Sequence, residues 1–323
     1  MSIPSLTALP EFADVEAAAV RIAPHVQKTP VRTSHSLDAL AGAELFFKCE
    51  NLQRAGAFKF RGASNAVWSL ADDVAKRGVV THSSGNHGAA VALAAKTRGI
   101  AAHVVVPEGA VKSKVAAIER YGAKLHRCAP TMSARDEAVE RLLAETGGTL
   151  VHPYTTPAVI AGQGTAAAEL IAEVGALDAV ITPIGGGGLI GGTSIATRVL
   201  SPNARLFAAE PEGAADAYES LRRGERVREL KADTICDGLR AIIGEINFEL
   251  LRKYEVTVLR VADTETIAAM RMIFERMKLV VEPSSAIALA AILKHRDYFA
   301  SRRVGVVLTG GNVDIDALPW QES

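Results

Sequence analysis

The segment AVITPIGGGGLIGGTSIATRVL, residues 179–200, decides the fold. It predicts a buried strand over 179–182, then a glycine loop, then a helix over 189–200. Between a strand and a helix N-terminus, such a loop brings several backbone N–H groups onto one phosphate. The Gly-Lys-Ser/Thr of a nucleotide P-loop is missing, and the glycines are not spaced as in dinucleotide-binding folds. We therefore predict a phosphate-binding loop, with a flexible linker as the alternative.

Strands and helices alternate in the same way over most of the chain. β-Branched runs predict further strands at 78–83, 102–106, 124–128, 205–209 and 304–309. Ala-rich or amphipathic segments predict helices at 87–98, 112–121 and 132–145. Because such alternation forms βαβ units, we expect an α/β fold with open parallel sheets. Gly147, Gly148 and Pro153 are the clearest break in the pattern, so we expect one sheet domain before them and another after.

Composition disfavours several classes of partner. Lys plus Arg number 36, as do Asp plus Glu, so nothing favours nucleic acid or an anionic membrane as a partner. No apolar run approaches the roughly 20 residues of a membrane span. Cys49, Cys128 and Cys236 are too scattered for a metal site or a disulfide framework. Residues 1–9 lack a basic region followed by an apolar block, so we expect no signal peptide and a cytoplasmic protein.

A lysine between two phenylalanines is the first candidate for chemistry. In KCENLQRAGAFKFRGA, residues 48–63, Lys59 lies between Phe58 and Phe60 at the start of a predicted helix. Partial desolvation disfavours the ammonium form and lowers the lysine pKa. A neutral amine is what Schiff-base chemistry requires. The alternative is an amphipathic lysine whose stem covers apolar surface while its head reaches water.

A polar loop in THSSGNHG, residues 81–88, lies where a strand ends and a helix begins. Small residues at a helix N-terminus leave N–H groups free for an anion such as a carboxylate. Side-chain donors are added by Ser83, Ser84, Asn86 and His87. The alternative is an ordinary helix N-cap followed by a polar loop.

Two later segments also carry oxygen ligands. In EPEGAAD, residues 210–216, Glu210 and Asp216 offer carboxylates and Ala214 a carbonyl to a hard divalent cation. Solvated loop acids are the alternative. In LTGGNV, residues 308–313, the hydroxyl of Thr309 follows the last predicted strand. It would face the crevice at the carboxyl edge of a parallel sheet, where open α/β folds bind ligands.

Taken in order, these segments resemble the fold-type II pyridoxal-phosphate (PLP) enzymes, which have a tryptophan synthase β-like fold. The resemblance is strongest to the branch of threonine/serine dehydratases, serine racemases and 3-hydroxyaspartate dehydratases, and it covers nearly the whole chain. It implies a large PLP-binding domain made of residues 1–70 and 156–323. It also implies a small mobile domain at 71–155 and a homodimer.

The resemblance implies a role for each candidate residue. Lys59 corresponds to the lysine that binds PLP as a Schiff base and removes the Cα proton, and Ser84 to the second acid/base group of the racemases. The other cofactor contacts would be Phe58 at the ring, Asn86 at the phenolic oxygen, Thr309 at the pyridine nitrogen, where this branch usually has a serine, and Gly185, Gly186, Gly187, Gly188 and Leu189 at the phosphate. The substrate carboxylate would bind to Ser83, Ser84, Asn86 and His87. Mg²⁺ or Ca²⁺ would bind to Glu210, Ala214 and Asp216.

The implied reaction is β-elimination, which converts a β-hydroxy-α-amino acid into a 2-oxo acid and ammonia. Arg135, in SARDEA, corresponds to an arginine that faces the distal carboxylate of dicarboxylic ligands, which a guanidinium binds as a bidentate fork. The alternative is an exposed arginine paired with Asp136 or Glu137. We predict an ammonia-lyase that converts 3-hydroxyaspartate to oxaloacetate. A threonine/serine dehydratase, or a serine racemase with dehydratase side activity, is the alternative.

Overall fold

The computed structural model describes residues 8–110 and 112–320. The prediction about a signal peptide concerns residues 1–9 and falls largely outside these ranges. Among the described helices, none combines the length and the apolar character that crossing a bilayer demands.

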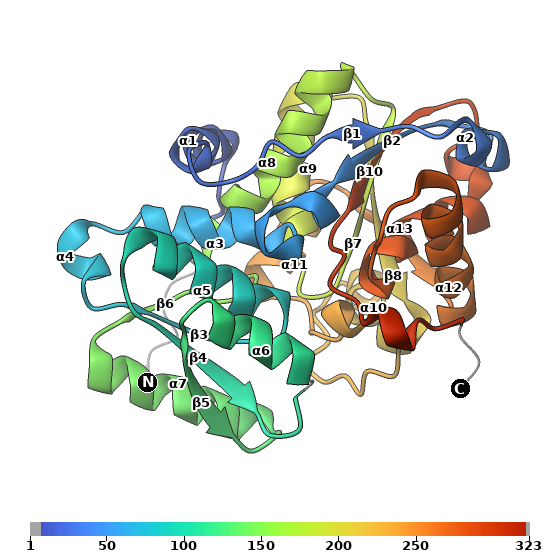
Figure 1. The fold of residues 1–323 in the computed structure, drawn as a ribbon. Helices are drawn as coiled ribbons and strands as arrows, with labels where there is room; N and C mark the ends of the chain where they lie inside the picture. Colours follow the sequence, from blue (N-terminus) through green and yellow to red (C-terminus); the bar gives the residue numbers. More distant parts are fainter. Residues whose placement is uncertain (1–7, 111, 321–323) are drawn as a thin grey trace.

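The larger of two sheets takes its strands from both ends of the chain (Figure 1). In the described residues its order is β1-β2-β10-β7-β8-β9, and β1 alone runs antiparallel to its neighbour. These strands are β1 (Val31–Arg32), β2 (Glu44–Cys49), β7 (Ala179–Pro183), β8 (Arg205–Pro211), β9 (Thr257–Val261) and β10 (Arg303–Leu308). The N-terminal segment therefore joins the C-terminal half of the chain in one sheet.

The smaller sheet is wholly parallel and comes from one continuous stretch. Its order is β5-β4-β3-β6, with the strands β3 (Val79–His82), β4 (Ala102–Pro107), β5 (Lys124–Cys128) and β6 (Thr149–Leu150). The chain is thus an α/β protein with two parallel-sheet domains, as the sequence predicts.

Helices cover both faces of the larger sheet. Alternate residues of one strand point to opposite faces, so Ile181 packs toward α13 while Val180 packs on the other side. Figure 1 shows α8 and α9 on one face and α12 and α13 on the other. The helices are α1 (Phe12–Ile22), α2 (His35–Ala41), α3 (Lys59–Trp68), α4 (Asp72–Ala75), α5 (Asn86–Arg98), α6 (Lys112–Arg120), α7 (Met132–Thr146), α8 (Pro157–Val174), α9 (Gly188–Leu200), α10 (Asp216–Arg223), α11 (Glu245–Lys253), α12 (Asp263–Met272) and α13 (Pro283–Lys294).

The predicted strands and helices all occur, within two residues at each end. The sequence analysis did not predict β1, β2, β6 or β9. β6 also shows that the Gly147–Gly148 pair does not end the smaller sheet. Gly147 adopts φ +63° and caps α7, and the chain then returns to pair with β3.

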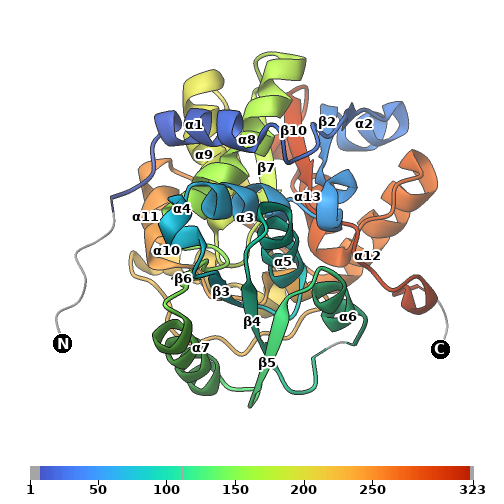
Figure 2. The same ribbon diagram turned by 60° about the vertical axis from the view of Figure 1, so that its left-hand side comes forward.

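Helix α3 lies between the two sheets and packs on both α5 and α8 (Figure 2). A buried ionic network fixes its first turn. The guanidinium of Arg61 forms charged hydrogen bonds of 2.7–2.8 Å to both Glu50 and Glu169. Lys48 of β2 also donates to Glu169, at 2.7 Å. The position of Lys59, two residues before Arg61, is therefore set by contacts to β2 and α8.

Candidate active site

A cavity of about 680 Å³ lies at the C-terminal ends of β3, β7 and β10, and Thr309 directly follows the last of these strands. Carboxyl ends of parallel strands are the usual ligand edge of such folds. Every residue predicted to contact cofactor or substrate lines this cavity: Phe58, Lys59, Ser83, Ser84, Asn86, His87, Arg135, Gly185, Gly186, Gly187, Gly188, Leu189 and Thr309. Segments far apart in sequence thus meet at one site.

Lys59 projects into this cavity from the first residue of α3. Its Nζ donates to the carbonyl of Pro153 at 2.9 Å and lies 5.2 Å from the centroid of the Phe58 ring. Burial lowers the lysine pKa to about 8, although the nearby Glu282 carboxyl opposes this shift. At pH 7 the ammonium is still the main form, but about a tenth of the amine is uncharged, far more than in an ordinary lysine.

The glycine loop is free to bind an anion. The structure gives the N–H groups of Gly188 and Leu189 no acceptor within the described part of the chain, as expected for the first turn of a helix. A Cβ on Gly186 would lie 2.4 Å from the Tyr154 ring, and one on Gly187 would lie 2.7 Å from Asn247 Cβ. Only glycine fits here, so the loop presents backbone rather than side chains. This arrangement suits a phosphate group.

Two residues that the sequence analysis did not single out hold the glycine loop in place. Asn247 Nδ2 donates to the carbonyls of Gly186, at 2.6 Å, and Tyr154, at 2.8 Å. Tyr154 follows Pro153, the acceptor of Lys59. An asparagine in an amphipathic helix and a tyrosine after a proline carry no motif, so only their contacts identify them.

The polar loop before α5 offers backbone donors. No acceptor is present for the N–H groups of Asn86 and His87 in the residues described. The His87 ring is committed elsewhere, because its Nε2 lies 3.0 Å from the Val151 carbonyl, which only accepts. Burial holds the His87 pKa well below its ordinary value, so Nδ1 is an acceptor and the ring does not donate to a carboxylate. The sequence analysis counted His87 among the side-chain donors, but the donor that His87 offers to the cavity is its backbone N–H.

Arg135 extends into the cavity from the first turn of α7. Its Nε is buried and has no hydrogen-bond acceptor in the described structure. Glu137, one of the neighbours weighed as an ion-pair partner, accepts from Ser133 Oγ at 2.6 Å. Beside Arg135, burial lowers the pKa of His82 to about 4, so this imidazole is neutral. The guanidinium thus faces the cavity with one N–H unused.

Thr309 is tied to the start of the lysine segment. It is buried at the end of β10, its N–H donates to Ser285 Oγ at 2.8 Å, and its carbonyl accepts from Phe58 N at 2.9 Å. Glu282, three residues before Ser285, also lines the cavity. A signal for it was present in the sequence: an acid inside the apolar run VVEPSSAIALA, residues 280–290.

The carboxylates of Glu210 and Asp216 form a separate buried cluster. Glu210 accepts from the N–H groups of Ala217 and Tyr218, and Asp216 Oδ2 accepts from Ile243 N at 2.7 Å. Asp216 Oδ1 is buried without a partner. Burial raises the pKa of Glu210 to about 8 and that of Asp216 to about 6. The described residues contain no cluster of three His, Cys, Asp or Glu side chains, so a cation here would also need the carbonyl of buried Ala214.

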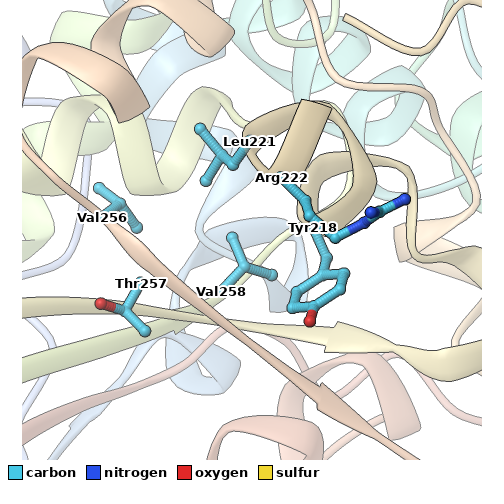
Figure 3. A pocket seen from close by; sticks show the side chains of 6 residues that line it. All are labelled: Tyr218, Leu221, Arg222, Val256, Thr257 and Val258. Atoms are coloured by element: carbon cyan, nitrogen blue, oxygen red, sulfur yellow. The ribbon is translucent and has the colours of Figure 1, made fainter. Parts of the chain in front are cut away.

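A second hollow, of about 260 Å³, lies between α10 and β9 (Figure 3). The side chains of Leu221, Val256 and Val258 surround it. It lacks the convergence of titratable groups that marks the larger cavity, which we therefore take as the active site.

Two parallel sheets, a buried lysine and a loop of unpaired backbone N–H groups define the fold-type II class of PLP enzymes. The chain belongs to the pyridoxal-phosphate dependent enzyme family, whose model matches residues 22–310. It is 48% identical, over 97% of its length and 99% of the relative's, to beta-hydroxyaspartate dehydratase of Paracoccus denitrificans. It is 46% identical to serine racemase of Arabidopsis thaliana, with 95% of each chain covered. The structure of maize serine racemase matches with a TM-score of 0.94 at 44% identity over 96% of each chain.

Proposed function

We propose that this PLP-dependent enzyme is an ammonia-lyase that acts on 3-hydroxyaspartate. The substrate loses water by β-elimination, and hydrolysis of the resulting enamine gives oxaloacetate and ammonia. The observation that carries this proposal is the unpartnered Nε of Arg135 in the same cavity as Lys59. The similarity to a beta-hydroxyaspartate dehydratase supports it.

The residues of the cavity fit the cofactor and the reaction. PLP, when bound, supplies the electron sink that makes the Cα hydrogen acidic. We propose that the N–H groups from Gly185 to Leu189 bind the phosphate, with Phe58 against the ring, Asn86 at the phenolic oxygen and Thr309 at the pyridine nitrogen. Lys59, with its lowered pKa, takes the Cα proton. Ser84 lines the same cavity and is the proposed second acid/base group.

Substrate orientation follows from the two free sets of donors. The α-carboxylate binds to the hydroxyls of Ser83 and Ser84 and to the N–H groups at the start of α5, from Asn86 and His87. The distal carboxylate binds to Arg135. A guanidinium offers five donors in a planar fork, and a carboxylate matches two of them. Serine and threonine have no second carboxylate, so they would leave this arginine unpaired.

A serine racemase with dehydratase side activity, or a threonine/serine dehydratase, is the second candidate. The 46% identity to a serine racemase is close to that for the hydroxyaspartate enzyme. Ser84 supports racemisation, because a second acid/base group can return the proton to Cα. Release of 2-oxo acid from serine, threonine and each hydroxyaspartate isomer separates the two candidates.

Further properties belong to the same proposal. The unpartnered Oδ1 of Asp216 fits a hard cation, so we propose Mg²⁺ or Ca²⁺ bound by Glu210, Asp216 and the Ala214 carbonyl. We propose that residues 71–155 form a small mobile domain, with 1–70 and 156–323 as the large domain. A cytoplasmic homodimer is also expected; size-exclusion chromatography with light scattering tests its oligomeric state.

The decisive experiment replaces Arg135 by alanine. Loss of one partner from a desolvated pair costs about 2–4 kcal/mol, which is roughly a 30- to 1000-fold fall in kcat/KM for hydroxyaspartate. Turnover of serine and threonine should fall much less. Arg141→Ala is the matched control, because Arg141 is exposed on the same helix. Equal losses for all substrates, or threonine turnover far above that of hydroxyaspartate in the unmutated enzyme, would move the assignment to the second candidate.

A further inference from the structure

Glu282 is a buried acid in the cavity wall to which neither the sequence nor the proposed reaction gives a role. It is 4% exposed and directly precedes α13. Its N–H donates to the Gly310 carbonyl at 3.0 Å, and a Cβ on Gly310 would lie 2.7 Å from its Oε1. The neighbouring lysines are engaged elsewhere: Lys59 donates to the Pro153 carbonyl, and Lys114 contacts Asp237.

The partner of Glu282 is the side-chain amide of Asn86. Asn86 Nδ2 lies 2.8 Å from Glu282 Oε1 and 3.1 Å from Oε2. On its other side, Asn86 Oδ1 accepts from Asn312 Nδ2 at 2.9 Å. The same Asn312 nitrogen donates to the Ala55 carbonyl at 2.8 Å. The side-chain amide at the start of α5 is thus held between Glu282, which precedes α13, and Asn312, which lies in the loop after β10.

This chain of hydrogen bonds has only one consistent direction. A backbone carbonyl accepts and never donates, so the atom of Asn312 that faces Ala55 is the nitrogen. The atom of Asn86 that faces Asn312 Nδ2 is therefore the oxygen. The nitrogen of Asn86 consequently faces Glu282 and needs an acceptor there. Because an amide nitrogen carries two hydrogens, the two carboxyl oxygens can share one and leave the second for a ligand in the cavity.

We propose that Glu282 is a positioning residue for the reaction, which fixes the Asn86 amide with a donor N–H available to the bound cofactor. The inference rests on the proposed cofactor contact of Asn86 and is independent of which amino acid is the substrate. Glu282 acts through Asn86 and is not proposed to contact the substrate or the cofactor itself.

Because Glu282 ionises, the strength of its hydrogen bonds with the Asn86 amide depends on pH. Burial and then the nearby Asp237 raise the pKa of Glu282 to about 7, while the hydrogen bond from Asn86 and the charges of Lys114 and Lys59 act in the opposite direction. The ionised carboxylate offers two acceptor oxygens to Asn86. The protonated acid offers fewer acceptor sites and becomes a donor itself. Asn86 is therefore held more firmly above pH 7 than below it.

The test uses the holoenzymes of the unmutated protein, Glu282→Gln and Asn312→Asp. The unmutated protein should show an ionisation near pH 7 in two measurements between pH 5.5 and 9: the absorption band of the bound cofactor, and kcat/KM for whichever substrate it turns over. Glu282→Gln, which keeps the shape, should abolish that ionisation and lower kcat/KM about 10- to 100-fold. Asn312→Asp removes the donor to Asn86 and should also alter the cofactor band.

A double variant and a charge control complete the test. If both residues act on one amide, the double variant should be about as active as the less active of the two single variants. Asp237→Asn removes a neighbouring charge without touching Asn86, so it should shift the ionisation to lower pH and keep it. The proposal is overturned if Glu282→Gln lowers only the melting temperature, if the two single losses multiply, or if Asp237→Asn abolishes the ionisation. The absorption measurement needs no substrate, so it stands even if the hydroxyaspartate assignment fails.

Discussion

Two sets of carboxylates, buried except for the partly exposed Glu169, differ in their partners. The paired set, Glu50 and Glu169, shares the guanidinium of Arg61. The unpaired set, Glu210, Asp216 and Glu282, accepts hydrogen bonds from backbone N–H groups or an amide. Burial by itself disfavours the charged form of a carboxylate. In Glu169 the bonds from Arg61 and Lys48 outweigh burial and lower its pKa, whereas the pKa of each member of the unpaired set is raised.

This difference in partners distinguishes carboxylates that stabilise the fold from carboxylates that we propose to have a function. A buried ion pair with all its hydrogen bonds made is a complete unit that holds elements in register, here β2, α3 and α8. A buried carboxylate without a cation costs stability and persists where something else binds or where a proton is exchanged. The unpaired set therefore marks the proposed cation site and the proposed support of Asn86, while the paired set marks the scaffold beneath Lys59.

The largest expected effect comes from breaking the paired set. Arg61→Met leaves two carboxylates facing a buried apolar side chain, so the free energy of unfolding should fall by about 3–5 kcal/mol. Urea denaturation monitored by circular dichroism measures this. Glu282→Gln is the comparison variant and should change stability far less. If Arg61→Met costs under about 1 kcal/mol, the network does not fix α3 as we describe.

An intermediate effect is expected from a cation bound at Glu210 and Asp216, two members of the unpaired set. Without it, the folded protein holds a proton on Glu210 that the unfolded chain releases, between pH 4.5 and about 8. Stability from this group therefore falls as pH rises through that window. Mg²⁺ or Ca²⁺ at 100 times its Kd should add about 2.7 kcal/mol near pH 8, and less at pH 5.5, where protons compete.

Thermal unfolding with added cation and with chelator, at both pH values, checks this expectation. A cation response of equal size at pH 5.5 and pH 8 would place the ion elsewhere. No response at either pH would indicate that Glu210 and Asp216 bind no cation.

The smallest expected effect is the change in stability when one carboxyl group is replaced by an amide, and its sign differs between the two sets. Asp216→Asn removes an unpaired buried charge and keeps the acceptor for Ile243 N, so the cation-free protein should gain about 1–2 kcal/mol at pH 8. It should also lose its response to the cation. Glu50→Gln is the matched change in the paired set and should lower stability, because Arg61 loses a charged partner. Differential scanning calorimetry of both variants compares them; destabilisation by Asp216→Asn without cation would contradict the unpaired description.

Local pattern was enough to predict the elements that carry ligand-binding loops. The glycine loop predicted a phosphate cradle because four consecutive glycines between a strand and a helix admit few other structures. β-Branched runs predicted β3, β4, β5, β7, β8 and β10. Two-residue strands such as β1 and β6 are too short to leave a pattern. In β2, the buried Lys48 interrupts the apolar run that would otherwise have indicated a strand.

By itself, then, the sequence determined the alternating α/β order, the glycine loop and Lys59 as the candidate amine, because these depend on spacing within a few residues. Whether a charge is paired was decided only by the tertiary structure. Arg61 and Arg135 both lie in the first turns of helices, yet one contacts two carboxylates and the other has an N–H unused in the cavity. The tautomer of His87 and the direction of the Asn86 amide depend likewise on carbonyls at Val151 and Ala55. Such partners are distant in the chain, and a hydrogen bond exists only where folding brings donor and acceptor within about 3 Å.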